Sequence, residues 1–303
     1  MTDMVWTVPI ALSLIHEGDL DLDEYLYAHG DGRLRDVDGH WISYFPTSGS
    51  AAIAPVVWAV ESAMRLESLD LYEHLKAAPD WELVARLNQG IASLFAALAV
   101  LAVYLTGRVS LGRPQAALLA LVAAFGTSLW STASRDLWQH TVSVFAVAWV
   151  VYLLVRAKGH PGWALFWCGL AAGIAYAVRP TNSLLVLLAT AYVWVEHRRR
   201  LLVFLSGAAV IAIPFVLYNL NLFGSPLAPY FQPDRLGYSP LFWEALAGNL
   251  VSPSRGLLVY SPLLLFAAYG LALKVRRRQF DRLDGFLASA IVLHWLAISG
   301  FRH

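Results

Sequence analysis

The chain has 303 residues, of which 58% are hydrophobic and only 14% charged, and its formal net charge at pH 7 is +1. This composition excludes an ordinary soluble domain, because a soluble domain of this length needs a largely charged surface. The single cysteine, Cys168, lies in an apolar run and cannot form an internal disulfide. The sequence has no phosphate-binding loop, C-x-x-C or H-E-x-x-H motif. We therefore expect no cofactor, no metal ion and no nucleic-acid partner.

The first two apolar stretches, 4–15 and 51–64, are too short to cross a bilayer, which takes about 20 residues. The first contains a proline, follows Asp3 and lacks the basic segment that opens a signal peptide. The second carries Pro55 and Glu61. We expect both stretches to form helices that lie in the membrane interface.

The rest of the chain is dominated by apolar stretches close to membrane length. They predict an all-α protein, a polytopic transmembrane bundle of about eight spans. We assign residues 1–87 to an extracytoplasmic loop that carries both interfacial helices, and residues 88–303 to the helical core. The predicted spans are 88–106, 115–133, 139–155, 162–178, 183–195, 201–218, 257–273 and 284–300.

The connections between these spans alternate in charge without exception. One set contains 12 of the 22 Lys and Arg residues and only three acids, and the opposite set contains 10 basic and 18 acidic residues. Loops rich in Lys and Arg face the cytoplasm. We therefore predict a multi-pass protein of the cell membrane (plasma or inner membrane) with an extracytoplasmic active face. The basic set comprises Arg108, Arg113, Arg156, Lys158, Arg198, Arg199, Arg200, Lys274, Arg276, Arg277, Arg278 and Arg282.

The unusual polar residues all belong to the opposite, outward-facing set. They are the acid-rich stretch 17–24, the cluster in SRDLWQH (134–140), Arg179 and Arg255. Ionisable groups near a membrane are costly and commonly serve a function. Their position at span ends predicts one shared cavity on the outer face.

Several outward-facing segments resemble a known family. Residues 1–60 contain MVWTVPIALSLIHEGDLDLDEY and DGHWISYFPTSGSAAIAPVVWA, and LWQHT, AVRPTNSLL and SPSRGLLVYSP follow at later span ends. These segments are similar to the outer loops of bacterial GT-C membrane glycosyltransferases. The similar branch is related to dolichyl-phosphate-mannose protein mannosyltransferases and lipid A aminoarabinose transferases. In that family a membrane helix precedes an acidic motif, whose position Asp3 occupies here, and further helices follow the FRH ending. We therefore expect an internal fragment or a misassigned start.

The resemblance implies a sugar donor carried on a polyprenyl phosphate and a lipid, glycan or protein acceptor outside the cytoplasm. Membrane lipid is the third expected partner. Such a transfer needs a carboxylate that accepts the proton of the acceptor hydroxyl. It also needs cations that stabilise the departing lipid phosphate. A single base with in-line attack inverts the anomeric centre, in contrast to the two carboxylates of retaining hydrolases.

Two aspartates are candidates for this base. Asp3 matches the position of the acidic motif, although an aspartate at a chain end can also be merely mobile. Asp19 is the second candidate. It lies in an acidic run with Asp21, Asp23 and Glu24, which we interpret as structural. The run can also be read as a solvated loop, and its alternation with leucines permits an extended edge with one apolar side.

Three arginines are candidates for binding the donor phosphate. We rank Arg255 first, because helix-start amides and a guanidinium can hold a phosphate together. Arg179 precedes a proline that interrupts its helix, although arginines in such positions also reach lipid headgroups. Arg135 ranks last, because the adjacent Asp136 can neutralise its charge.

Three further residues complete the candidate site. Asp136 and His140 share one face if a helix begins there, and they are too few ligands for a metal ion. In the alternative interpretation, Asp136 forms an ion pair with Arg135, and His140 is a histidine that lies in the membrane interface. Tyr230 can line a sugar site by stacking.

Two other function classes remain open. A transporter or flippase of a lipid-linked substrate is marked by an inverted repeat and by charged, broken helices at mid-bilayer. The sequence has no internal repeat, and its charges lie at span ends. A non-catalytic, truncated paralogue is the other alternative.

Overall fold

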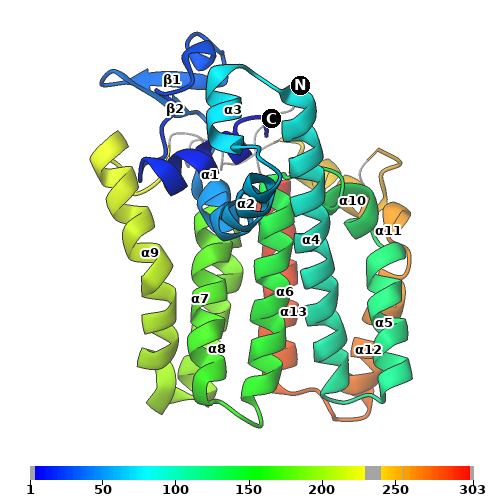
Figure 1. The fold of residues 1–303 in the computed structure, drawn as a ribbon. Coiled ribbons are helices and arrows are strands. Elements are labelled where there is room, and N and C mark those ends of the chain that lie inside the picture. The colour runs from blue at the N-terminus through cyan, green and yellow to red at the C-terminus, as the bar shows by residue number, and fades with distance from the viewer. Residues whose placement is uncertain (1–3, 229–239, 255, 301–303) are drawn as a thin grey trace.

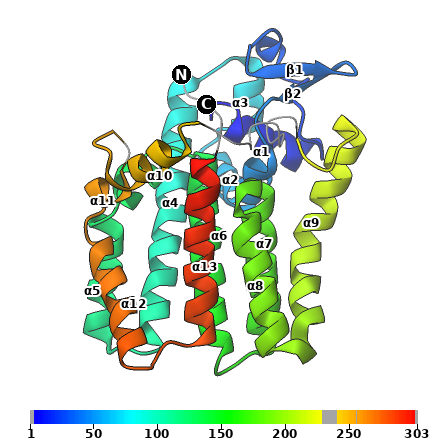
Figure 2. The ribbon, with the colours of Figure 1, turned by 180° about the vertical axis from the view of Figure 1, so that it is seen from behind.

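The computed structural model describes residues 4–228, 240–254 and 256–300. Long helices lie side by side and carry a cap of shorter elements at one end (Figures 1 and 2). The bundle helices are α4 (Trp81–Arg108), α5 (Arg113–Phe125), α6 (Gln139–Ala157), α7 (Gly162–Val178), α8 (Ser183–Glu196), α9 (Leu201–Phe223), α12 (Leu264–Arg276) and α13 (Arg282–Ser299). The predicted all-α class is confirmed.

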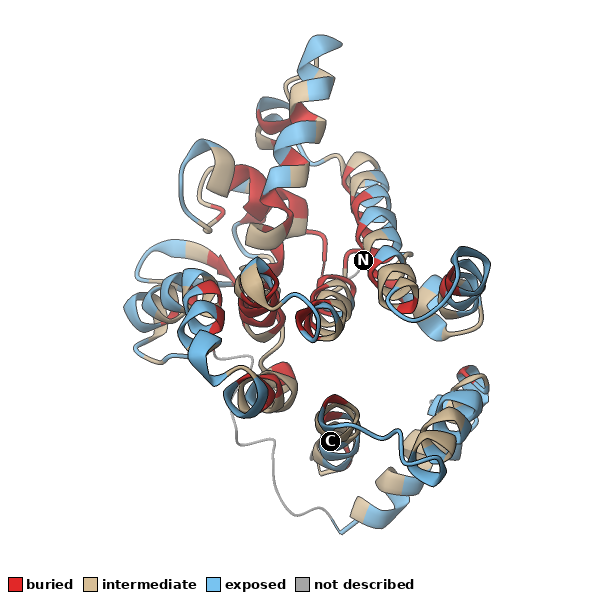
Figure 3. Cartoon of the chain, turned by 90° about the horizontal axis from the view of Figure 1, so that it is seen from below, coloured by how far each residue is buried: buried red, intermediate tan, exposed pale blue. Residues whose placement is uncertain are grey.

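Among the residues that the structure describes, four segments are long and apolar enough to cross a membrane: α4, α6, Arg198–Phe223 with α9, and α13. Buried residues gather between the helices, and exposed residues cover their outer faces (Figure 3). Many of the exposed side chains are large and apolar, such as Leu202 at 79% exposure and Phe266 at 71%. Apolar surface of this extent marks contact with a membrane or a partner. Together with the spans, it identifies a polytopic membrane protein.

Two of the predicted spans are interrupted. The helix predicted over 115–133 ends at Phe125, and a π-helical turn, η2 (Leu129–Ala133), follows Gly126. The span predicted over 257–273 is divided into the short helix α11 (Leu257–Tyr260) and α12. Pro262 explains the second break, because a proline disfavours helical geometry in the residue before it. Ser261 accordingly has φ −141° and ψ 62°.

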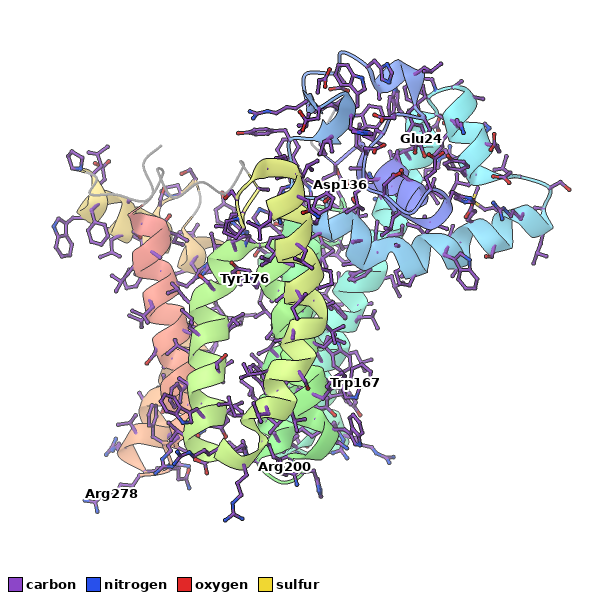
Figure 4. All side chains as sticks on the ribbon, turned by 90° about the vertical axis from the view of Figure 1, so that its left-hand side faces the viewer. Glu24, Asp136, Trp167, Tyr176, Arg200 and Arg278 are labelled. Atoms are coloured by element: carbon purple, nitrogen blue, oxygen red, sulfur yellow. The ribbon has the colours of Figure 1, made fainter. Side chains whose placement is uncertain are left out.

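The cap consists of residues 4–80. It contains α1 (Thr7–His16), the 3-10 turn η1 (Leu26–Ala28), β1 (Leu34–Val37), β2 (His40–Ser43), α2 (Ser48–Leu66) and α3 (Leu71–Ala77), and α10 (Phe242–Val251) lies at the same end of the bundle (Figure 2). Helix α2 runs across the bundle axis (Figure 4). It continues through Pro55 and exceeds the predicted 51–64 at both ends. Exposed Trp58 and Leu66 suit an interfacial helix.

Helix α1 differs from the predicted interfacial helix, because protein surrounds it. Every residue from Val8 to Ser13 is buried. Glu61 of α2, only 2% exposed, accepts hydrogen bonds from His16 at 2.8 Å and from Arg65 at 3.1 Å. The side-chain amide of Asn88 on α4 donates to the carbonyl of Met4 at 3.1 Å. These contacts fix α1 between α2 and the bundle.

A β-hairpin forms the outer part of the cap. Strands β1 and β2 pair antiparallel, with Leu34 opposite Ser43. Asp38 and Gly39 both have positive φ, the geometry that an Asp-Gly hairpin turn requires. Asp21 pairs with Ile42 and adds a short third edge. This pairing is the extended edge that the alternation of acids and leucines permits.

The two sets of loops lie at opposite ends of the bundle. Arg200 and Arg278 lie at one end, which we call the basic end, and Glu24 and Asp136 lie toward the other, the cap end (Figure 4). All three acids of the basic set form ion pairs: Lys158–Asp281, Lys274–Asp284 and Arg282–Glu196. The basic loops and the cap therefore lie at opposite ends of the bundle, as the alternation of charge along the sequence predicts.

Candidate functional site at the cap end

Two hollows lie where the cap meets the bundle, on either side of the segment 43–50. One is a shallow hollow with about 390 Å³ of empty space, part of it open solvent, between α1, this segment and the start of α6. The other has about 280 Å³ of empty space, also partly open solvent, between the same segment and the end of α9. Both hollows are lined by aromatic and small polar side chains, including Trp6, Phe45, Trp138, Ser43, Ser50, Thr47, Tyr218 and Asn219.

Arg179 contacts His140, although the two residues are far apart in the sequence. Helix α7 ends at Val178, Arg179 is extended, and Pro180 starts the 3-10 turn η3 (Pro180–Asn182). The predicted helix break is therefore confirmed. The guanidinium Nη1 approaches the imidazole Nδ1. Because a guanidinium only donates, Nδ1 must accept, and the ring carries its proton on Nε2.

The helix break is held in place by Asn182, which is only 7% exposed. Its side-chain amide donates to Ser143 Oγ on α6 and to the carbonyl of Ala175 on α7, both at 2.8 Å. One buried side chain thereby joins the end of α7 to the start of α6. Arg179 is held at the same junction, which explains its position over His140.

Asp136 lies before α6 and does not share a helix face with His140. Helix α6 begins at Gln139, after an extended Trp138. Asp136 accepts the backbone N–H of Leu137 at 2.8 Å, and its carbonyl accepts from Thr141 at 3.1 Å. The prediction of one shared face is wrong, because these local hydrogen bonds form a turn before the helix. Arg135 is exposed, and no ion pair of its guanidinium with a described residue is found.

Asp19 lies at the end of α1, on the surface of the cap. The hydroxyl of buried Ser13 donates to Asp19 Oδ1 at 2.8 Å. Asp21 and Asp23 both contact His40, at 3.3 and 2.7 Å. The acidic run is therefore not a solvated loop, because its side chains are held by specific partners.

Glu24 has the most unusual environment in this run. Both of its carboxyl oxygens are buried, and neither has a hydrogen-bond partner among the described residues. Burial raises the pKa of the Glu24 carboxyl to about 7. A signal for this burial exists in the sequence, because Glu24 continues the alternation of Leu20 and Leu22, which point inward. The prediction that Glu24 is only a structural member of the acidic run does not include this burial.

We expect Glu24→Gln to stabilise the protein at pH 8 and to have little effect at pH 5. The folded-state pKa of Glu24 is raised from 4.5 to about 7, so this carboxyl costs nothing below pH 4.5. The cost grows as pH rises toward 7 and is constant above it. Glutamine carries no charge at any pH. The stabilisation at pH 8 should be about 2 kcal/mol, measured by unfolding of the detergent-solubilised protein at both pH values. Equal effects at both would contradict the burial of an ionisable group.

Three candidate residues, Asp3, Arg255 and Tyr230, lie outside the described residues. Of the other candidates, the structure brings Arg179 and His140 together. It places Asp136 and Arg135 just before the helix that carries His140. Asp19 belongs to the cap.

This arrangement defines a class of protein: a helical membrane protein with a polar site at one end of its bundle. Residues 82–220, nearly all of α4 through α9, match the sequence model of a family described as dolichyl-phosphate-mannose-protein mannosyltransferase. The match confirms the resemblance to GT-C glycosyltransferases and supports a membrane glycosyltransferase of this type. It includes Arg135, Asp136, His140 and Arg179. No curated protein and no solved structure matches the chain.

Proposed function

We propose that the protein transfers a sugar from a polyprenyl-phosphate donor to an acceptor outside the cytoplasm, with inversion at the anomeric carbon. The contact between Arg179 and His140 carries this proposal. It lies at a helix break, at the cap end, within the segment that matches the mannosyltransferase family. The guanidinium of Arg179 and the N–H group of His140, a cation and a hydrogen-bond donor at the membrane boundary, are suited to bind a lipid phosphate.

The chemistry of the pair fits a leaving phosphate. Arginine keeps its charge at all working pH values and can hold two phosphate oxygens at once. The imidazole of His140 offers Nε2–H as a further donor. Such donors stabilise the negative charge that develops as the sugar–phosphate bond breaks. We propose Arg255 and Arg135 as additional phosphate ligands, Asp136 and His140 as groups that shape the phosphate site, and Tyr230 as a stacking partner of the sugar.

The base is the second requirement of the proposal. We propose Asp3 for this role, by its match to the acidic motif of the family, and Asp19 as the alternative. Asp19 is exposed and uses Oδ1 for the bond to Ser13. A carboxylate retains further acceptor sites after one such bond. Asp19 can therefore still take the proton of an acceptor hydroxyl.

We expect Asp3→Asn in the full-length protein to lower the transfer rate by about 100-fold or more, the range that a general base contributes. Affinity for the donor lipid should change little, because the amide has nearly the shape of the carboxylate. Turnover and donor binding should be measured for Asp3→Asn, Asp19→Asn and the wild type. Loss in Asp19→Asn alone would assign the base to Asp19. Unchanged turnover in both variants would exclude both aspartates.

The proposed orientation can be tested by labelling single cysteines in intact cells. The native Cys168 is fully buried and gives little background. We expect Ser134→Cys and Ser254→Cys to react with a membrane-impermeant thiol reagent, because these residues belong to the outward-facing set. Arg199→Cys at the basic end should not react until the cells are opened. Labelling of Arg199→Cys alone would reverse the orientation and place the site in the cytoplasm.

A further inference from the structure

We propose that Asp21, Asp23 and His40 form a binding site for one divalent transition-metal ion, with zinc as the best-matched ion. The three residues lie in the hairpin region of the cap, where the 21–23 edge meets β2. One ligand atom of each residue lies within 4.8 Å of the other two. This inference goes beyond sugar transfer and does not depend on it.

The distances suit a small ion. His40 Nδ1 is 2.7 Å from Asp23 Oδ2 and 3.3 Å from Asp21 Oδ2. Zinc binds nitrogen and oxygen ligands at about 2.0–2.2 Å in tetrahedral geometry, which places neighbouring ligand atoms about 3.4 Å apart. The His40–Asp21 distance already matches, the His40–Asp23 distance is the shorter of the two, and the ligand oxygens of the two aspartates lie within 4.8 Å of each other. One imidazole with two carboxylates is a donor set that zinc accepts.

The backbone orients both carboxylates toward the imidazole. Asp23 Oδ1 accepts the backbone N–H of Trp41 at 2.7 Å. Asp21 Oδ1 accepts the backbone N–H of Asp23 at 3.2 Å. Each carboxylate thus uses one oxygen for the backbone and turns the other, Oδ2, toward His40. Outer hydrogen bonds of this kind orient the ligands of metal sites.

The charge of the cluster distinguishes it from an ordinary ion pair. His74 and Asp80 form such a pair at 3.2 Å, with one carboxylate for one imidazole. His40 faces two carboxylates, and Asp19 adds a third negative charge nearby. Within the described ranges, no Lys or Arg pairs with Asp21 or Asp23. A doubly charged cation would balance the two carboxylates, which a single imidazolium cannot do.

A bound ion would fasten the acidic edge to the hairpin. At present the edge is joined to β2 by the Asp21–Ile42 bridge, the Leu22–Trp41 backbone bond and the side chain of Asp23. Metal bonds from both sides would add to these contacts. The ion is therefore expected to stabilise the cap, and its removal should loosen the segment that carries Asp19 and Glu24.

The test is titration of the metal-stripped, full-length protein with zinc alone, by calorimetry, in detergent and without a polyhistidine tag. We expect one zinc ion per chain and a higher unfolding temperature after loading. His40→Gln and Asp21→Asn should each weaken zinc binding by at least about 10-fold and abolish the thermal shift. His74→Gln, which alters the matched His–Asp pair, should bind zinc as the wild type does.

Neither ligand variant should disturb the fold, because His40 is exposed and Asp21→Asn preserves the shape of the side chain. A loss of zinc binding in either variant would therefore report on the site itself. Both variants should elute as the wild type does in gel filtration. No zinc bound to the wild type would overturn the proposal. Binding that survives in both ligand variants would do so as well, because the ion would then lie elsewhere.

Discussion

Replacement of Arg179 by glutamine is expected to weaken binding of a polyprenyl phosphate by about 10- to 150-fold. This loss corresponds to about 1.5–3 kcal/mol, the contribution of a hydrogen bond to a charged group. Arg179 is held over His140 at the break between α7 and α8. Glutamine keeps part of the length of the side chain and removes its charge. Binding should be measured with a short-chain polyprenyl phosphate in detergent micelles.

The matched control for this variant is Arg86→Gln. Arg86 is also an arginine near the cap end, but it is 73% exposed and pairs with Glu82 on its own helix. Its replacement should leave the affinity nearly unchanged, because exposed pairs of this kind contribute little. Arg255→Gln and Arg135→Gln complete the series. If Arg179→Gln binds normally while Arg255→Gln does not, Arg255 holds the phosphate and Arg179 has only a structural role.

Gly169→Val is expected to destabilise the protein by about 3 kcal/mol or more, at the upper end of overpacking effects. Helices α7 and α9 approach closely at this glycine, as small residues allow in membrane bundles. A Cβ atom at Gly169 would lie 1.9 Å from the backbone oxygen of Phe204. Gly207 faces α7 in the same way, 2.0 Å from the oxygen of Phe166. Backbone atoms cannot move aside cheaply, so the helices must separate.

Gly270→Val is the control for this packing prediction. Gly270 also lies within a helix, α12, but nothing lies within 4 Å of a Cβ atom placed there. The measurement is the unfolding temperature and the monodisperse fraction of each variant after extraction in detergent. Gly169→Val should lose most of its folded fraction, and Gly270→Val should retain it. Similar behaviour of the two variants would contradict close contact between α7 and α9.

The membrane architecture could be predicted because its signals are local in the sequence. Hydropathy and loop charge located the bundle and its basic end, and Pro180 marked the break after Arg179. A hydropathy window averages many residues, so the effect of a single residue is lost in it. The helix breaks at Gly126 and Pro262 were missed for this reason. The β-hairpin was missed for a different reason. The Asp38–Gly39 pair is typical of a hairpin turn, but the residues around it have no clear alternation of apolar and polar side chains that would predict strands.

The candidate site depends more on packing than on pattern. Arg179 and His140 were both selected from the sequence, yet their contact depends on how Asn182 joins α6 and α7. No local rule gives that geometry. His40 was not selected at all, because a single exposed histidine carries no pattern, and only strand pairing brings it to Asp21 and Asp23. The burial of Glu24 could have been predicted, because Glu24 lies two residues after the buried Leu22 and points to the same side of an extended segment.

The most direct test of sugar transfer uses purified full-length protein in vesicles made with a membrane extract, which supplies the lipid, glycan and protein acceptors. The vesicles also contain a polyprenyl-phosphate sugar labelled in both the sugar and the lipid. Time-dependent separation of the two labels, with polyprenyl phosphate as the lipid product, is the result that a glycosyltransferase predicts. The separation should disappear in Asp3→Asn if Asp3 is the base. Movement of the intact, doubly labelled lipid across the bilayer without separation would contradict sugar transfer and would identify a flippase.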